Sequence, residues 1–193
     1  MDDIDRWLDP NDLGNTERFL QCHKRTIALL ELVGQYAPDR NSKILDVGCG
    51  CGRDILALRN AGYGLTFGVD VNEAARGLVP DVYLIFGRIP DVLNYADGTF
   101  ELAYSWTTLQ HLSPAQLPIT ARRLLDIAAL VVVIECELQQ RHDYIWAHDY
   151  RDVFERAGAV QLHECIIDTR GEPFGGIYTA RVFRSNDATT SGD

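Results

Sequence analysis

The sequence is short of basic residues and has no long apolar run. Lys and Arg together number 18 against 28 Asp and Glu, which gives a formal net charge of -10 at pH 7. Sequence-independent binding of nucleic acid depends on Lys and Arg neutralising phosphates, so this balance disfavours a DNA or RNA substrate. No apolar run approaches the ~20 residues that span a bilayer, and residues 1–12 are acidic, unlike a signal peptide. We therefore expect a cytoplasmic protein without a membrane segment.

The five cysteines lack the spacing of a metal or redox site. They stand at positions 22, 49, 51, 136 and 165, with no C-x-x-C pair and no histidine at zinc spacing. Cys49 and Cys51 lie between glycines, where small side chains are needed. The sequence predicts free thiols and no metal site.

The stretch from residue 44 to residue 54, Ile-Leu-Asp-Val-Gly-Cys-Gly-Cys-Gly-Arg-Asp, carries the strongest signal. Its apolar start indicates the end of a buried strand, and glycines at every second position from Gly48 prevent the strand from continuing. Ile55, Leu56 and Leu58 then recur at helical spacing. A strand, a glycine turn and a helix form the ligand cradle of doubly wound folds, outside the carboxyl ends of the strands.

Two common nucleotide motifs are absent from this turn. A G-x-G-x-x-G fingerprint counted from Gly48 would need a glycine at Arg53, and no lysine follows to complete G-x-x-x-x-G-K-[ST]. The pattern present is D-x-G-x-G-x-G, from Asp46 to Gly52. With this motif the chain resembles the class I S-adenosylmethionine (SAM)-dependent methyltransferases, over roughly residues 40–184.

Asp70 supports the same interpretation. It ends a second predicted strand, at about the ~20-residue separation expected for a carboxylate that binds ribose hydroxyls. Two adjacent hydroxyl donors match the two oxygens of one carboxylate, although a solvated acid at a strand end is the alternative. The resemblance implies SAM as cofactor and a binding site made of Asp46, Gly48, Cys49, Gly50, Gly52, Asp70, Val71, Asn72, Arg88, Ile89, Ser105 and Trp106.

The chain departs from the family where adenine is expected. The family often has a Gly-Asp-Ala-like sequence whose acid contacts the adenine amino group, whereas this chain has Gly87-Arg88-Ile89. We expect the backbone amides of Arg88 and Ile89 to read the base instead. Trp106, at the carboxyl end of the fourth predicted strand, either covers the cofactor with its indole or packs in the core.

Three histidines are candidates for a general base. His111 lies in an L-x-H-L segment that the family often has after its fourth strand, and histidine titrates near neutral pH. His142 and His148 lie in the segment 138–148, which follows the fifth strand and is expected to overhang the methyl group; Glu137 is a weaker candidate. The alternative is that these residues pack or anchor the next helix.

The N-terminal helix is expected from Thr16 to about Gly34 and to close one wall of the substrate cleft, as the resemblance implies. His23 and Arg25 then either face the methionine end of the cofactor or lie on the helix surface.

The acceptor is constrained by a missing motif. Methyltransferases that modify exocyclic base amines carry [ND]-P-P-[YF] after the fourth strand, and here the residues are Ser105-Trp106-Thr107-Thr108. The sequence therefore favours in-line methyl transfer to a small-molecule O or N acceptor. The alternatives are a non-catalytic SAM-binding module acting as regulatory subunit or sensor, and a nicotinamide-dependent oxidoreductase.

The expected fold class is α/β, a three-layer α/β/α sandwich with a doubly wound, mostly parallel seven-stranded sheet and a C-terminal antiparallel hairpin. The hairpin follows from the apolar runs 160–167 and 176–183, since no helix fits between them. Ser113 and Pro114 are expected to open a helix, and residues 82–86 to form the third strand. One domain is expected over residues 16–184, between an N-terminal loop, 1–15, and a disordered tail, 185–193.

Overall fold

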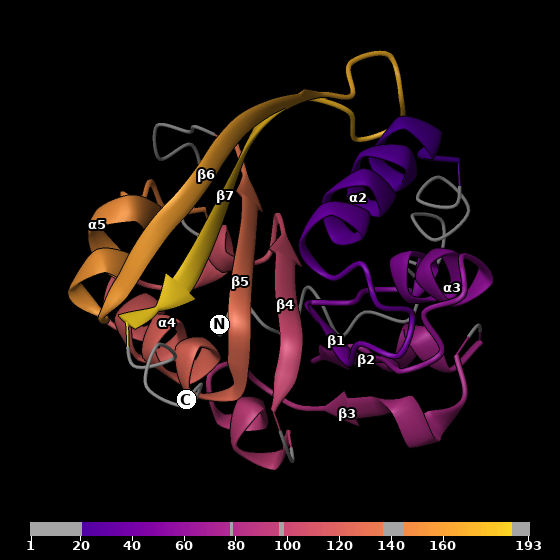
Figure 1. Cartoon of the computed structure of the whole chain (residues 1–193), viewed down its shortest axis with the longest axis horizontal. Helices are drawn as coiled ribbons and strands as arrows, with labels where there is room; N and C mark the ends of the chain where they lie inside the picture. Colours follow the sequence, from indigo (N-terminus) through magenta and orange to yellow (C-terminus); the bar gives the residue numbers. More distant parts are fainter. Residues whose placement is uncertain (1–20, 78, 97–98, 137–144, 187–193) are drawn as a thin grey trace.

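The structure, a computed structural model, describes residues 21–77, 79–96, 99–136 and 145–186. Its α-helices and strands alternate along most of the chain, as in other α/β proteins (Figure 1). In chain order the elements are α2 (His23–Tyr36), β1 (Ile44–Val47), α3 (Arg53–Asn60), β2 (Thr66–Asp70), η3 (Glu73–Gly77), η4 (Asp81–Tyr83), β3 (Leu84–Phe86), η5 (Asp91–Tyr95), β4 (Phe100–Trp106), η6 (Leu109–His111), α4 (Gln116–Ile127), β5 (Ala128–Glu135), α5 (Tyr150–Arg156), β6 (Ala159–Asp168) and β7 (Ile177–Ser185).

One sheet of seven strands organises the molecule, with the order β3-β2-β1-β4-β5-β7-β6. The first five strands pair in parallel, and β7 pairs antiparallel with both β5 and β6. The expected fold class, a mostly parallel sheet with a C-terminal hairpin, is confirmed. The order reverses at β1, so the turn after β1 lies at the switch point where doubly wound sheets bind ligands.

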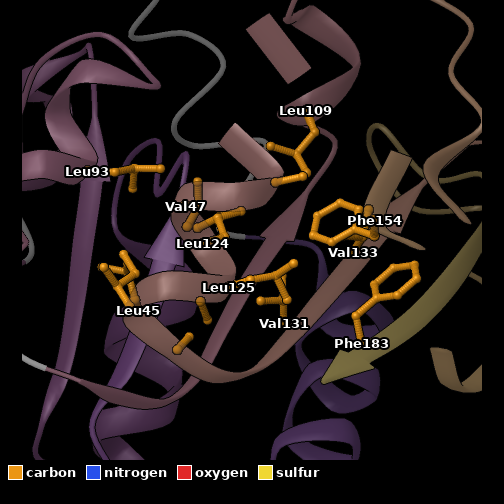
Figure 2. Packing of buried hydrophobic residues seen from close by; sticks show 14 of the residues in the cluster. Leu45, Val47, Leu93, Leu109, Leu124, Leu125, Val131, Val133, Phe154 and Phe183 are labelled. Carbon is orange, nitrogen blue, oxygen red and sulfur yellow. The ribbon is translucent and has the colours of Figure 1, made fainter. Parts of the chain in front are cut away.

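Helices cover both faces of the sheet and bury two apolar clusters. On one face, α4, α5 and η5 pack against side chains such as Val131 and Val133 of β5, and Phe154 stacks on Phe183 with ring centroids 4.5 Å apart (Figure 2). Burial of each such aromatic side chain is worth roughly 2–3 kcal/mol. On the other face, α2 and α3 pack against alternate residues of the same strands, Ile44, Leu102, Tyr104, Val132 and Val182 among them.

Short-range features define the two ends of α5 and the end of the final strand. Asp149 caps α5, where its Oδ1 accepts from the backbone nitrogen of Asp152 at 3.0 Å. Gly158 follows the end of α5 with φ +94°, a left-handed conformation that glycine adopts without steric cost. The final strand extends to Ser185, two residues beyond its expected end at Phe183.

Two boundaries were predicted wrongly. The helix expected from Ser113 begins at Gln116, although the carbonyl of Ser113 already accepts from the backbone nitrogens of Gln116 and Leu117. The third strand covers only Leu84–Phe86, because residues 81–83 form the 3-10 turn η4 directly after Pro80. The expected loop 1–15, the helix start at Thr16, the turn at 97–98 and most of the tail lie outside the described residues.

Candidate functional site

The turns after β1, β2 and β3 are joined by backbone hydrogen bonds at the carboxyl edge of the sheet. The nitrogens of Gly48 and Cys49 donate to the carbonyl of Val69 at 2.8 and 3.1 Å, and the nitrogen of Gly87 donates to the carbonyl of Asp70 at 2.9 Å. These bonds place the glycine turn beside the ends of the two neighbouring strands. The segments predicted to hold a nucleoside therefore lie together.

Asp70 connects the second strand to the glycine turn through its side chain. Its Oδ2 accepts from the nitrogen of Gly50 at 2.7 Å, and its Oδ1 accepts from the nitrogen of Asn72 at 2.8 Å. Burial raises the pKa of Asp70, against the hydrogen bonds from Asn72, Gly50 and Val71 that lower it. The two carboxylate oxygens together have about four acceptor positions, more than the three backbone hydrogen bonds use.

The three glycines of the turn have different surroundings. All have positive φ, at +84° for Gly48, +54° for Gly50 and +79° for Gly52. A methyl group on Gly48 would lie 2.0 Å from Oγ1 of Thr108, whereas a methyl group on Gly50 would have no atom within 4 Å. Protein atoms fill the space at Gly48, and the space at Gly50 is open to a ligand.

The side chain of Cys49 lies in the core and not in that space. Cys49 is 7% exposed and packs with Ile55, Val79 and Leu84, and burial raises the pKa of its thiol well above the usual value. All five cysteines of the chain are free thiols. Cys49 therefore offers a ligand only its backbone.

Helix α2 reaches the glycine turn through Arg25. The Arg25 guanidinium lies 4.5 Å from the centre of the Trp106 ring and forms an ion pair with Asp54 of α3, with Nη2 and Oδ2 3.1 Å apart. Arg53 pairs with the other oxygen of Asp54 at 2.6 Å. Burial raises the pKa of Asp54, but the charges of Arg25 and Arg53 outweigh it and hold the pKa below its usual value. His23, by contrast, is exposed.

Asp46 is buried near the ion pair of Arg25 and Asp54 and does not lie at the surface of the glycine turn. It is 3% exposed on the face covered by α2 and α3, next to Tyr104 of β4. Burial raises the pKa of Asp46 to about 8, and the neighbouring charge of Asp54 adds to that effect. The raised pKa favours the neutral form of Asp46, which packs beneath the glycine turn.

Ser105 and Trp106 are both buried. Trp106 is 2% exposed and packs edge-on against Tyr178, with ring centroids 5.4 Å apart. Of the two alternatives for Trp106, the structure therefore shows core packing. Ser105 is 1% exposed on the opposite face of β4.

Arg88 and Ile89 follow the third strand, next to the end of β2. The Arg88 side chain is exposed, and its carbonyl accepts from the nitrogen of Val92 at 2.7 Å. Ile89 is half-buried and packs against the core beneath α4. No carboxylate stands at this position of the described chain, so any adenine contact here uses backbone groups or the Arg88 side chain.

Comparison with known proteins identifies the family. A family model described as a methyltransferase domain matches residues 17–164. The chain belongs to this family. No curated protein matches the sequence.

Solved structures similar to this methyltransferase domain share its fold. Magnesium protoporphyrin IX methyltransferase from Synechocystis PCC 6803, with bound SAM, has a TM-score of 0.62 and 17% identity, covering 84% of this chain and 80% of that one. The 1,6-didemethyltoxoflavin-N1-methyltransferase of Burkholderia thailandensis, with bound 1,6-didemethyltoxoflavin and S-adenosylhomocysteine, has a TM-score of 0.64 and 16% identity, covering 92% and 82%. The [4+2]-cyclase SpnF has a TM-score of 0.58 and 17% identity, covering 82% of this chain and 80% of that one.

The candidate histidines of the methyltransferase domain have unequal positions. The His148 ring nitrogen Nε2 lies 2.8 Å from the carbonyl of Leu112, and burial lowers the pKa of His148 against that hydrogen bond. His111 ends η6, with its Nε2 3.4 Å from Nε2 of Gln110. His148 therefore ties the segment before α5 to the turn after β4, and His111 lies in that turn. His142 and Glu137 lie outside the described residues.

Three residues of the site were not predicted from the sequence. Thr108 fills the space at Gly48, Asp54 binds Arg25, and Glu135 is a carboxylate buried at the end of β5. Asp54 stands two residues after the last glycine of the motif, so its position in the sequence could have indicated a place in the site. Glu135 stands at the end of an apolar run, and nothing in its neighbours in sequence distinguishes it.

Two structural findings bear on ligands and membranes. Across the described ranges, no helix is long and apolar enough to cross a bilayer. Within the same residues, no group of three or more His, Cys, Asp or Glu side chains is placed to hold a metal ion.

Proposed function

We propose that this methyltransferase domain binds SAM at the glycine turn and transfers its methyl group to a small-molecule O or N acceptor. The observation that carries the proposal is the hydrogen bond between Gly50 and Asp70, beside the open space at Gly50. It puts a carboxylate with spare acceptor positions at a backbone that a ligand can approach closely. A ribose offers the two adjacent hydroxyl donors that such a carboxylate accepts.

Other groups near the glycine turn suit the remaining parts of the cofactor. The half-buried Asp70 is suited to the ribose, and the turn at Arg88 and Ile89 is suited to the base. Arg25 is the cation nearest the glycine turn on α2, and its guanidinium is suited to a carboxylate such as that of the methionine group. Bound SAM would supply an activated methyl group on a sulfonium, so the protein's contribution is to align the acceptor with it.

The acceptor class is inferred from charge and from motifs. A net charge of -10 and the sequence Ser105-Trp106-Thr107-Thr108 in place of [ND]-P-P-[YF] support a small molecule over a nucleic-acid base. A general base is needed only for an acceptor that must lose a proton. His111 and His148 are the described candidates for that role; the ring of His111 lies next to Gln110, and that of His148 next to the carbonyl of Leu112.

Calorimetric titration with SAM and, separately, with NADH tests the cofactor. We expect binding of SAM alone. The substitution Asp70→Ala should raise the Kd for SAM at least about tenfold, because hydrogen bonds to a charged group are worth about 1.5–3 kcal/mol. Asp126→Ala removes an exposed carboxylate at the end of α4 and should leave the Kd unchanged. Wild-type affinity in folded Asp70→Ala would overturn the assignment of the ribose site.

A second candidate function is binding without methyl transfer. The similarity of fold to a [4+2]-cyclase supports it, because that enzyme is named for a different reaction. Release of S-adenosylhomocysteine with a panel of small hydroxyl and amine acceptors separates the two. Turnover with any acceptor supports the methyltransferase, and tight SAM binding with none favours the second candidate.

A further inference from the structure

Glu135, the last residue of β5, is a carboxylate buried at the edge of the sheet where the site lies. It is 1% exposed, and its Oε1 accepts from the nitrogen of Leu109 at 2.8 Å. Its Oε2 is also buried and has no hydrogen-bond partner among the described residues. Burial raises the pKa of Glu135 to about 8, against the amides of Leu109, Gln110 and Thr108 that lower it. Burial of a carboxyl group costs free energy. The hydrogen bond of Glu135 is made to the turn after β4.

That turn has a conformation that its own sequence does not favour. Thr107 has φ +59°, which is rare for a β-branched residue and is energetically unfavourable. The nitrogen of Thr107 donates to the carbonyl of Ile134 at 2.9 Å, and the Gln110 side chain donates to the carbonyl of Thr107 at 3.1 Å. Bonds from β5 therefore hold the turn on both sides of Thr108, at Thr107 through Ile134 and at Leu109 through Glu135.

The turn after β4 also contacts the glycine turn. Thr108 stands so close to Gly48 that an added methyl group there would be 2.0 Å from its Oγ1. The path of contact runs from Glu135 through the amide of Leu109 to Thr108, and from Thr108 to Gly48, two residues before the open space at Gly50.

We propose that Glu135 is a positioning residue for the cofactor site, which sets the geometry of the glycine turn by holding Thr108 against Gly48. The inference rests on the proposed function, since it concerns the affinity of the same SAM site. Among the described residues Glu135 forms no hydrogen bond with Gly50 or with Asp70, the proposed ribose ligand. It acts through the turn of residues 107–111.

The test is a double-mutant cycle on the affinity for SAM, measured by calorimetry. Glu135→Ala and Thr108→Ala should each raise the Kd about tenfold, and the double variant should bind no more weakly than the worse single variant, because both act through one turn. Glu135→Gln retains an oxygen that accepts from Leu109 and should recover most of the affinity. It also serves as the folded variant if the alanine variant does not fold.

The matched control is Glu101, at the opposite end of β4. Its carboxylate also accepts from a backbone nitrogen, that of Lys43, but away from the site. Glu101→Ala should leave the Kd unchanged, and its effect on stability should add to that of Thr108→Ala. Wild-type affinity in folded Glu135→Ala, or losses that multiply in the double variant, would overturn the inference.

Amide hydrogen exchange separates failure of this inference from failure of the proposed function. The amides of Leu109 and Gln110 should exchange at least about tenfold faster in Glu135→Ala than in the wild type, with or without SAM, and at close to the wild-type rate in Glu135→Gln. If the wild type does not bind SAM, the proposed function is wrong and the inference about the site falls with it. Unchanged exchange at both amides would show that Glu135 does not hold the turn.

Discussion

Arg25 of α2 and Asp54 of α3 form a buried ion pair above the glycine turn, with Nη2 and Oδ2 3.1 Å apart. Arg53 shares the same carboxylate at 2.6 Å. Two guanidinium groups thus depend on one carboxylate, and the two sides of the ion pair are not equivalent. Loss of an arginine leaves Asp54 with a partner, whereas loss of Asp54 removes the carboxylate that the buried Arg53 and the partly buried Arg25 share.

The first prediction follows from that asymmetry. Arg25→Ala should lower the free energy of unfolding by about 1–3 kcal/mol, because Asp54 keeps its bond to Arg53. Asp54→Ala should lower it by about 3–5 kcal/mol, the cost of leaving buried charge without its partner. Urea unfolding followed by circular dichroism measures both. Equal losses for the two variants would contradict the shared-carboxylate account.

The second prediction contrasts two glycines of one turn. Gly48→Ala should prevent stable folding or shift the turn, because the new methyl group overlaps Thr108. Gly50→Ala should cost only about 1–2 kcal/mol for the left-handed conformation, because nothing lies within 4 Å of the added atom. It should nevertheless weaken SAM binding, since the methyl group occupies the open space. Thermal unfolding with and without SAM distinguishes the two, and strong stabilisation of Gly50→Ala by SAM would contradict the assignment of that space.

The third prediction concerns the cap of α2. Glu172, in the connection between β6 and β7, accepts from the backbone nitrogens of Lys24 and Arg25 in the first turn of the helix. Figure 1 shows this connection next to α2. Glu172→Ala should lower the free energy of unfolding by about 1 kcal/mol, the usual loss for a helix cap.

Hydrogen exchange should locate that loss in the first turn of α2. Glu31→Gln changes an exposed carboxylate on the same helix and serves as the control. Equal exchange in the two variants would mean that Glu172 does not cap the helix.

The fourth prediction is a pH dependence of stability. The pKa of Asp46 is raised from 3.8 to about 8 in the folded chain. Between these values the folded chain holds a proton that the unfolded chain has released, so the contribution of Asp46 to stability falls as pH rises from about 4 to about 8. The free energy of unfolding of the wild type minus that of Asp46→Asn should therefore decrease from pH 5.5 to pH 8.5.

The wild type and the variant must be compared at each pH, because the contribution of His148 to stability changes with pH in the opposite direction to that of Asp46. Burial lowers its pKa, so its contribution to stability is lost at low pH, equally in both proteins. A difference that is constant with pH would show that Asp46 is ionised in the folded protein.

The parts of the fold that could be predicted are those that depend on local sequence patterns. The glycine turn and the helix that follows it depend on residues within one short segment, and both were predicted from it. Asp70 was predicted because its distance from the glycines follows from the length of a strand and a helix. The C-terminal hairpin was predicted from the lack of room for a helix.

The contacts across the sheet were not predictable in this way. Glu135 meets Leu109 and Thr108 meets Gly48 only because β4 lies between β1 and β5, an order that no single segment encodes. The positive φ of Thr107 runs against the preference of its residue type, so local propensity predicts the opposite. These are the places where bonds between distant segments override local preference.

The position of β7 has a consequence for how the protein is made. It is the last strand of the described chain, yet it lies inside the sheet between β5 and β6 and not at its edge. While a ribosome is still adding residues before Ile177, the apolar strand β5 has an open hydrogen-bonding edge. Such an edge invites pairing with other chains, so chains cut short before β7 are expected to aggregate even though the whole glycine turn is already present.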